Sequence, residues 1–437
     1  MQRTRGVTKL IGLLGVAAIA AVAVTPVAAS ATESTPALPD GVTSTTPPPL
    51  SPATAASKAG AVYQQSAPTP GAAVPLVTVE TTPTGPHIVA TPVRSQAQAR
   101  TVASDAARGH DLVVVKADTL VSPTAAPTND TYTKLGYQWG IDTTKTTFST
   151  AWKTTTGKGV TVAVVDTGVD ATHPDLAGQV LAGRSFLTGA SGTAALNPRV
   201  DTCGHGTHVA GTIDALANNR VGVAGAAPGV KILPVKVMNK ALNCSGYGSD
   251  VANGIKWAAD NGAKVINLSL GGTSDDPAQD LAIAYAHSKG VVVVAAAGNN
   301  HGPAATCHTV GTNAISYPGA SKYVIGVGAI DANFARGCFS NTGWYVDVVA
   351  PGVNVLSTYP VAITSAGYAP YAYMSGTSMA TPHVAAAAAL MLAKWPKCTP
   401  DKVEARLEAT AKRIGSTGRN NDYGYGLIDP ARAITAC

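Results

Sequence analysis

The sequence predicts an α/β fold, with a mostly parallel central sheet and helices on both faces. From residue 126 to residue 437, apolar strand-like runs alternate with helical stretches. The run VTVAVVD at 160–166 is apolar up to its last residue, which is typical of a strand covered on both faces. A segment of this length suits one large domain. Such alternation predicts helices packed on both sides of a parallel sheet.

The elements follow one another in a regular order. We expect strands at 160–166, 231–237, 264–270, 291–297 and 324–330, and helices at 205–217, 249–261, 277–289, 378–394 and 401–412. Ligands of such sheets bind beyond the carboxyl ends of the strands. Asp166, Ser269 and Asn299 lie at or just past predicted strand ends. His205 and Ser378 lie at predicted helix starts, so one edge of the sheet is expected to hold the functional site.

Residues 1–31 are expected to be a secretory signal peptide. Three basic residues precede an apolar run at 10–24, and Ala29-Ser30-Ala31 supplies a small-x-small cleavage site. A membrane anchor is the alternative, but the run is shorter than the roughly 20 residues that span a bilayer. We therefore expect a secreted, extracellular protein that has no membrane association after signal cleavage.

The next segment has two different compositions. Residues 32–74 are rich in Pro, Thr, Ser and Ala, which predicts disorder. Residues 75–117 contain strand patterns at 76–81 and 111–117 around a helical composition at 94–108. They predict a small folded unit, with a disordered stalk as the alternative.

Charge and cysteine content exclude some classes of function. A formal net charge of +6 over 437 residues is mild and dispersed, and no basic stripe with aromatic residues is present, so nucleic-acid binding is not expected. All six cysteines follow residue 200, and an even number in a secreted chain favours three disulfides. A metal site is the rival interpretation, but no CxxC pair occurs.

Three segments contain the residue types of nucleophilic catalysis. Ser378 follows Gly376-Thr377 at the start of an apolar helix. A serine hydroxyl attacks only beside a base and a group that orients the base. His205 lies between two glycines in DTCGHGTHVAGT, and Asp166 ends the first strand. The order Asp, His, Ser is that of subtilisin, whereas an α/β-hydrolase esterase would need G-x-S-x-G and another order.

The segments VAVVDTGVDATHPDL, HGTHVAGT and GTSMATPHVA resemble the three signature blocks of the subtilisin-like serine proteases, the subtilases of peptidase family S8. Further matching segments are VINLSLGG, AAAGNN, SYPGASKYVIGVGAI, VVAPGV and YGYGLIDPARA. The resemblance extends from about Gln138 to the C-terminus. It implies a single subtilisin-like domain and a secreted serine endopeptidase of the bacterial type.

The resemblance assigns roles to four residues. Ser378 would be the nucleophile, His205 the base, and Asp166 the residue that orients and stabilises the imidazole. Asn299, with the backbone N–H of Ser378, would form the oxyanion hole. The second histidine of HGTH, His208, would be structural.

Substrate binding follows from the same comparison. The resemblance places an extended peptide between two chain segments, Cys244-Ser245-Gly246 and Ser269-Leu270-Gly271. The latter segment and Ala296-Ala297-Gly298 would form the walls of the specificity pocket. These small walls favour broad specificity, with an apolar or aromatic residue before the scissile bond. The floor would come from residues 301–315.

A loop at 215–225, ALANNRVGVAG, resembles the calcium loop of subtilisins. The expected ligands are the side chains of Asp175, Asn219 and Gln138 and the carbonyls of Ala217, Val221 and Val223. A plain surface loop is the alternative, because only one carboxylate is present and calcium requires several oxygen ligands. No cofactor is expected for the chemistry itself.

The resemblance also divides the precursor. Residues 32–125 would be a propeptide that assists folding and inhibits the enzyme, and residues 126–437 would be the peptidase domain, acting on proteins or peptides as a monomer. The cysteines resemble those of aqualysin-type subtilases, which favours the pairs Cys203–Cys244, Cys307–Cys338 and Cys398–Cys437. A catalytically silent binding module and a processing protease with one substrate are the alternative functions.

Overall fold

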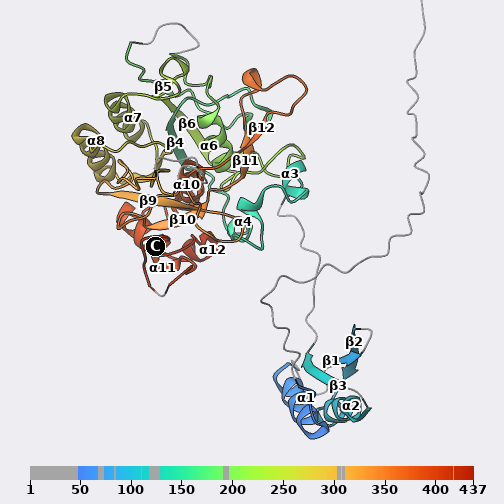
Figure 1. Cartoon of the computed structure of the whole chain (residues 1–437). Helices are drawn as coiled ribbons and strands as arrows, with labels where there is room; N and C mark the ends of the chain where they lie inside the picture. Colours follow the sequence, from blue (N-terminus) through green and yellow to red (C-terminus); the bar gives the residue numbers. More distant parts are fainter. Residues whose placement is uncertain are drawn as a thin grey trace, which may run out of the picture. The chain divides into compact units, whose positions relative to one another are not determined.

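The computed structural model describes residues 48–66, 73–82, 85–109, 111–117, 128–189, 196–302, 307, 311–416 and 418–437 (Figure 1). The chain divides into two compact units, Met1–Ser122 and Pro123–Cys437. The predicted signal peptide lies outside the described residues. So do residues 118–127, which contain the predicted boundary of the propeptide at residue 125.

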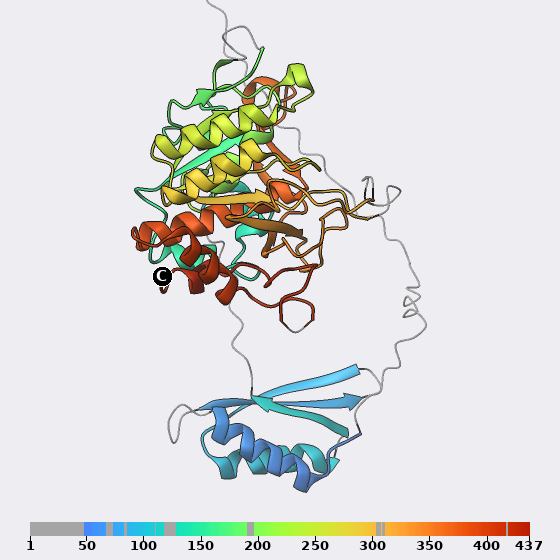
Figure 2. The same ribbon diagram turned by 90° about the vertical axis from the view of Figure 1, so that its left-hand side faces the viewer.

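The first unit is a three-stranded antiparallel sheet in the order β2-β1-β3, with two helices packed against one face (Figure 2). Its elements are α1 (Pro52–Ser66), β1 (Val74–Thr82), β2 (Gly85–Val93), α2 (Gln96–Gly109) and β3 (Asp111–Ala117). The strand patterns at 76–81 and 111–117 and the helical composition at 94–108 therefore correspond to real elements.

Helix α1 corrects one prediction: residues 52–66 are helical, not disordered. Ala55, Ala59 and Tyr63 recur every four residues and form one buried face. They pack in the same cluster as Ala103 of α2, and the Tyr63 hydroxyl donates a hydrogen bond to the Arg94 carbonyl (2.6 Å). The scarcity of large apolar residues had suggested disorder. The segment folds nevertheless, because a helix face made of alanines can pack closely against another helix.

The second unit is built on a seven-stranded sheet in the order β10-β9-β8-β7-β4-β6-β5, and every neighbouring pair is parallel. The strands are β4 (Thr161–Asp166), β5 (Arg184–Ser185), β6 (Lys231–Lys236), β7 (Val265–Leu268), β8 (Val292–Ala296), β9 (Val324–Ile330) and β10 (Val348–Pro351). The predicted α/β fold is confirmed.

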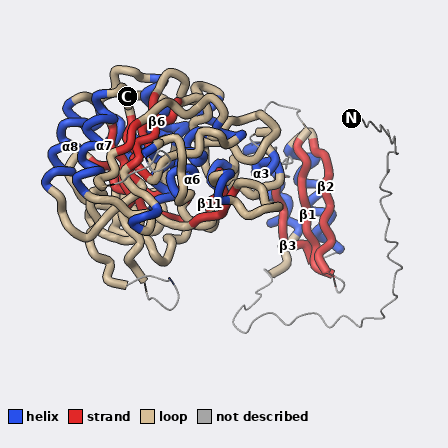
Figure 3. Tube along the Cα trace, turned by 90° about the horizontal axis from the view of Figure 1, so that it is seen from above, coloured by secondary structure: helices blue, strands red, loops and turns tan. Residues whose placement is uncertain are grey.

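Helices cover both faces of this sheet. They are α6 (His205–Asp214), α7 (Gly248–Asp260), α8 (Pro277–Ser288) and α10 (Thr377–Lys394). Figure 3 shows α7 and α8 on one side of the strands and α6 on the other. Along β4, Val162 and Val164 join the core cluster that includes α6 and α10, whereas Ala163 and Val165 join the cluster that includes α7 and α8. This double burial explains why β4 is apolar throughout.

Smaller elements complete the unit. They are α3 (Thr131–Lys134), η1 (Trp139–Ile141), α4 (Phe148–Trp152), η2 (Pro174–Leu176), η3 (Lys240–Leu242), the antiparallel pair β11 (Val355–Thr358) and β12 (Tyr371–Met374), η4 (Val361–Ile363), α11 (Pro400–Thr410) and α12 (Pro430–Ala433). The long apolar helix α10 is almost wholly buried in the core. Across the residues that the structure describes, no helix has both the length and the hydropathy to cross a membrane.

All three predicted disulfides are present. Cys203 pairs with Cys244, Cys307 with Cys338, and Cys398 with Cys437. The first bridge joins the segment that precedes α6 to the loop that precedes α7, with 5.9 Å between the two Cα atoms. Each bridge restricts the unfolded chain, which contributes roughly 3–4 kcal/mol to stability in a loop-entropy estimate.

Candidate active site

Asp166 and His205 are hydrogen-bonded to each other. Asp166 ends β4 and is completely buried, and His205 is the first residue of α6. The His205 Nδ1 atom lies 2.8 and 2.9 Å from the two oxygens of the Asp166 carboxylate. The Thr167 N–H donates to the same carboxylate (2.7 Å), which fixes its orientation. This geometry leaves Nε2 of the imidazole as the atom that can accept a proton.

Two opposing effects set the pKa of His205. Burial lowers it, because desolvation disfavours the imidazolium, but the negative charge and hydrogen bond of Asp166, together with the negative charge of Asp201, raise it by more. The pKa of His205 is therefore above its ordinary value of 6.5. The imidazole is a stronger base than a free histidine.

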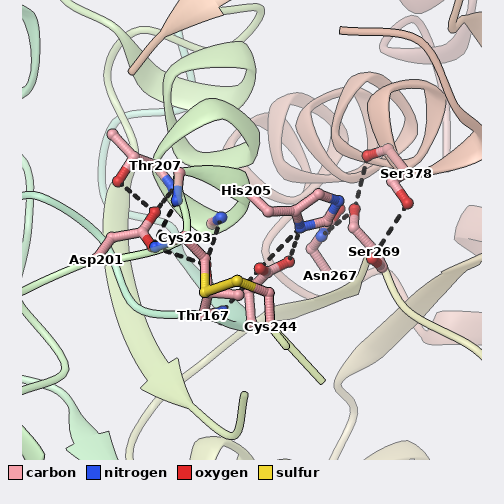
Figure 4. A network of polar contacts seen from close by, with 12 residues as sticks. Thr167, Asp201, Cys203, His205, Thr207, Cys244, Asn267, Ser269 and Ser378 are labelled. Atoms are coloured by element: carbon pink, nitrogen blue, oxygen red, sulfur yellow. Dashed lines mark hydrogen bonds and ion pairs between the residues drawn. A yellow bond between two sulfur atoms is a disulfide. The ribbon is translucent and has the colours of Figure 1, made fainter. Parts of the chain in front are cut away.

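Ser378 is the second residue of α10. Its Oγ donates to the Ser269 carbonyl (3.2 Å), and the Ser269 hydroxyl donates to the Ser378 carbonyl (2.8 Å). Figure 4 shows His205, Ser269 and Ser378 close together. The described side chains of Ser378 and His205 form no hydrogen bond with each other in this arrangement. Such bonds are often loose before substrate binds.

Asn299 is held in place by the residue before Ser378. Its Oδ1 accepts hydrogen bonds from the N–H (2.8 Å) and the hydroxyl (2.9 Å) of Thr377. A Cβ atom added to Gly376 would lie 3.5 Å from Asn299 Nδ2 and 3.6 Å from the Ser378 nitrogen. The amide and the Ser378 N–H therefore border one small space. Thr377 was not among the predicted site residues.

Asp201 is a second residue that the sequence analysis missed. It is buried, and its two oxygens accept five hydrogen bonds of 2.7–2.9 Å (Figure 4). The donors are the Thr167 hydroxyl, the Cys203 and Gly204 N–H groups, and the N–H and hydroxyl of Thr207. The Thr167 hydroxyl in turn accepts from the Gly206 N–H (2.9 Å). Asp201 thus connects the end of β4, just after Asp166, to the first turn of α6.

We expect Asp201→Asn to lower both stability and turnover. In the variant, an NH₂ group replaces one of the carboxylate oxygens, so buried N–H and O–H donors lose their acceptor. We expect the free energy of unfolding to fall by about 3 kcal/mol. Displacement of His205 lowers kcat by up to about 10²-fold. Unfolding should be measured in a Ser378→Ala background to prevent self-digestion. Asp250→Asn is the matched control, because Asp250 is also buried but bonds Thr188. Equal losses of kcat in both variants would contradict a positioning role.

A cleft of about 640 Å³ extends from His205 along the predicted substrate segments. Its lining includes Cys244, Ser245, Gly246, Ser269, Leu270 and Gly271. A neighbouring pocket of about 270 Å³ is lined by Leu270, Gly271, Ala296, Gly298, Asn299, Asn300, Ser316, Thr377 and Ser378, together with Gly272. The two cavities share the wall 270–272, so the structure brings most of the predicted binding residues together.

Ala297 is the exception. It was predicted as a pocket wall, but it is completely buried in the core, and its carbonyl accepts a hydrogen bond from the Tyr345 hydroxyl (3.0 Å). Successive side chains alternate across an extended chain, so Ala296 faces the pocket and Ala297 faces the core. Parts of the predicted floor, at 303–306 and 308–310, lie outside the described residues.

His208 and Asp170, which lie a few residues after His205 and Asp166 in the chain, have other partners. His208 is completely buried, and its Nε2 lies 3.0 and 3.1 Å from the carbonyls of Val355 and Ala372. Burial is the main reason that its pKa is lowered to about 3. Asp170 accepts hydrogen bonds from Thr172 and from the Val361 N–H. Neither residue is placed to act on Ser378.

The predicted calcium ligands lie around one loop. The Asp175 carboxylate accepts from the Asn219 amide (2.7 Å), the Val223 N–H (2.8 Å) and the Tyr371 hydroxyl (3.2 Å). Gln138 is bonded through both amide atoms to the backbone of Ala224. Ala217 and Val221 lie in the same loop. The Asp175 oxygens accept three hydrogen bonds within this loop and keep a lone pair each at most. Calcium binding by the loop stays a prediction, and no role in the mechanism is assigned to the ion.

Comparison with known proteins identifies the family. A model of the Subtilase family matches residues 157–426, which is more than half of the chain. The chain is a subtilase.

Known proteins resemble large parts of the chain. Subtilisin DY of Bacillus licheniformis is 44% identical over 273 residues, which cover 62% of this chain and 90% of that protein. The thermophilic serine proteinase of Bacillus sp. (strain AK1) is 44% identical over 310 residues, 70% of this chain and 69% of that protein. A solved protease of Pseudoalteromonas arctica superimposes with a TM-score of 0.61 at 36% identity, covering 70% of this chain and 98% of that one. This subtilase is thus a serine-type endopeptidase that acts on protein or peptide substrates.

Proposed function

We propose that the chain is a secreted endopeptidase that hydrolyses peptide bonds through an acyl-enzyme formed on Ser378. His205 takes the proton of the hydroxyl, which attacks the peptide carbonyl, and then returns the proton to the leaving amine. Asp166 holds the proton on Nδ1 and stabilises the imidazolium. Water then attacks the acyl-enzyme by the same sequence of proton transfers. The single observation that carries this proposal is the pair of Asp166–His205 contacts at 2.8 and 2.9 Å.

The tetrahedral intermediate needs donors for its oxyanion. The Asn299 side chain and the Ser378 N–H serve this purpose, because they border the same space above Gly376. Such donors are effective because they are already oriented before charge develops. Thr377 maintains the Asn299 orientation through two hydrogen bonds.

Substrate is held as an extended chain between 244–246 and 269–271, through backbone hydrogen bonds that do not depend on sequence. The residue before the scissile bond enters the pocket of about 270 Å³, whose lining contains no charged side chain among the described residues. An apolar or aromatic residue is therefore preferred there. The mature enzyme acts as an extracellular monomer, and the chemistry uses no cofactor.

The first unit is proposed as the inhibitory prosegment. Its compact sheet with two helices is consistent with a folding aid that is removed after the second unit has formed. Cleavage is expected between residues 118 and 132.

The experiment compares the precursor with its Ser378→Ala form. The wild type should lose the residues up to the 118–132 region and should digest casein, because Ser378 performs both reactions. The alanine form should do neither. Mass spectrometry of the secreted protein and a casein assay measure the two results. A Ser378→Ala protein that still matures and digests casein would exclude the proposed nucleophile.

A further inference from the structure

The substrate cleft ends among carboxylates. One wall is formed by residues 269–277. It begins at Ser269, whose hydroxyl is hydrogen-bonded to the Ser378 carbonyl, and it includes Asp275 and Asp276 just before α8. Both aspartates line the same cavity of about 640 Å³ that includes His205. A peptide bound at the catalytic end therefore has the two acids within the same cleft.

The negative charge in this region is not paired with a positively charged side chain of the described residues. Asp276 accepts from the Ala278 N–H (2.9 Å) and the Gln279 amide (3.0 Å), which are neutral groups. Desolvation and the neighbouring Asp280 and Asp276 carboxylates raise the pKa of Asp275. Among the described residues, no lysine, arginine or histidine forms an ion pair with any of these three acids. A cation entering the cleft would relieve this repulsion.

The opposite wall of the cleft includes two glycines. Gly246 and Gly248 line the cleft there without side chains. A Cβ atom added to Gly248 would collide with Oδ2 of Asp276, so that carboxylate lies directly against the glycine backbone. Asp276 thus reaches across the cleft to its other wall, and Asp275 beside it lines the same cavity. A flexible lysine or arginine could place its charge beside them while its aliphatic stem lies along the cleft.

We infer that the acidic end of the cleft binds a lysine or arginine side chain of the peptide substrate, at a position away from the scissile bond. This inference rests on the proposed function, and it adds a second determinant of specificity to the apolar pocket. Asp275 is the main contact, because it is exposed, whereas the carboxylate of Asp276 already bonds the first turn of α8.

The test uses quenched fluorescent peptides of one sequence, with Lys, Ala or Glu placed in turn at each position on either side of the scissile bond. The matured wild type should prefer Lys to Glu by about fivefold to tenfold in kcat/KM at one position, and the preference should weaken at high salt. Asp275→Asn should reduce the preference for Lys over Glu below about threefold. Asp422→Asn, an exposed acid outside the cleft lining, is the matched control.

The outcomes separate the two proposals. Lys and Glu peptides that are cleaved within twofold of each other at every position overturn the inference, as does a preference that Asp275→Asn leaves unchanged. A matured wild type that cleaves none of the peptides overturns the proposed function and, with it, this inference.

Discussion

Replacing Asp166 by asparagine is expected to lower kcat by about 10⁴-fold. In the wild type, the Asp166 carboxylate accepts hydrogen bonds from the Nδ1–H of His205 and from the Thr167 N–H. An asparagine of the same shape turns an NH₂ group toward Nδ1, so the neutral imidazole carries its proton on Nε2 instead. A protonated Nε2 cannot accept the proton of Ser378. Because the variant cannot mature itself, its precursor should be processed by tagged wild-type enzyme that is then removed. Peptide hydrolysis measures kcat.

Asp170→Asn is the matched control for this variant, because Asp170 is an acid four residues after Asp166 and bonds Thr172 and Val361 instead. Its kcat should stay within about threefold of the wild type. The reverse result, in which Asp170→Asn is inactive and Asp166→Asn is active, would show that the wrong carboxylate has been assigned to the triad.

The pH profile supplies an independent readout of the same pair. Only neutral His205 can accept a proton, so kcat/KM rises as pH increases through the pKa of His205. Asp166 raises that pKa above 6.5, so the midpoint of the acid limb should lie above this value in the wild type. In Asp166→Asn the burial that lowers the pKa of His205 remains, and of the charges that raise it only the weaker one, Asp201, is left. The midpoint of its residual activity should move to lower pH.

Asn299→Leu is expected to lower kcat by about 10²–10³-fold, with little change in KM. This magnitude comes from the corresponding asparagine of subtilisin itself and is carried over to this subtilase. The leucine has a similar shape but no N–H to donate, and the oxyanion exists only after attack, so substrate binding is spared. Steady-state kinetics on one peptide separate kcat from KM.

Asn300→Ala is the companion variant, because the neighbouring asparagine lies on the same turn and is not assigned an oxyanion contact. Its kcat should remain within about threefold of the wild type. A large rise in KM with unchanged kcat in Asn299→Leu would mean that Asn299 contacts the bound substrate and not the transition state.

The sequence predicted the central strands and helices because each has a strong local pattern. The apolar run of β4 is one example, and the long apolar segment of α10 is another. Helix α1 was missed because alanine and serine give little hydrophobic signal, although the four-residue spacing of Ala55, Ala59 and Tyr63 was visible. The hairpin of β11 and β12 was missed because strands of four residues give little periodic signal and the loop 359–370 that joins them is too long to be recognised as a tight turn.

The supporting residues of the site were harder to predict than the reacting ones. Thr377 contacts Asn299 across 78 positions, a proximity that no local pattern reveals. Asp201 did carry a signal, since an acid just before a helix start is suited to accept its free N–H groups. Ala297 was assigned to the wrong face of the chain. Side chains alternate between pocket and core at the end of a strand, but the sequence does not say which of them face the pocket.

The bridge between Cys203 and Cys244 has a consequence for a protease surrounded by copies of itself. Those copies can cut exposed chain, and the loop at 215–225 includes exposed residues within the 41-residue span that the bridge closes. A single cut in that loop would leave both ends covalently attached, so His205 and the 244–246 wall would remain on one molecule. An autolytic cut in this span therefore need not destroy the active site, as long as the disulfide stays oxidised.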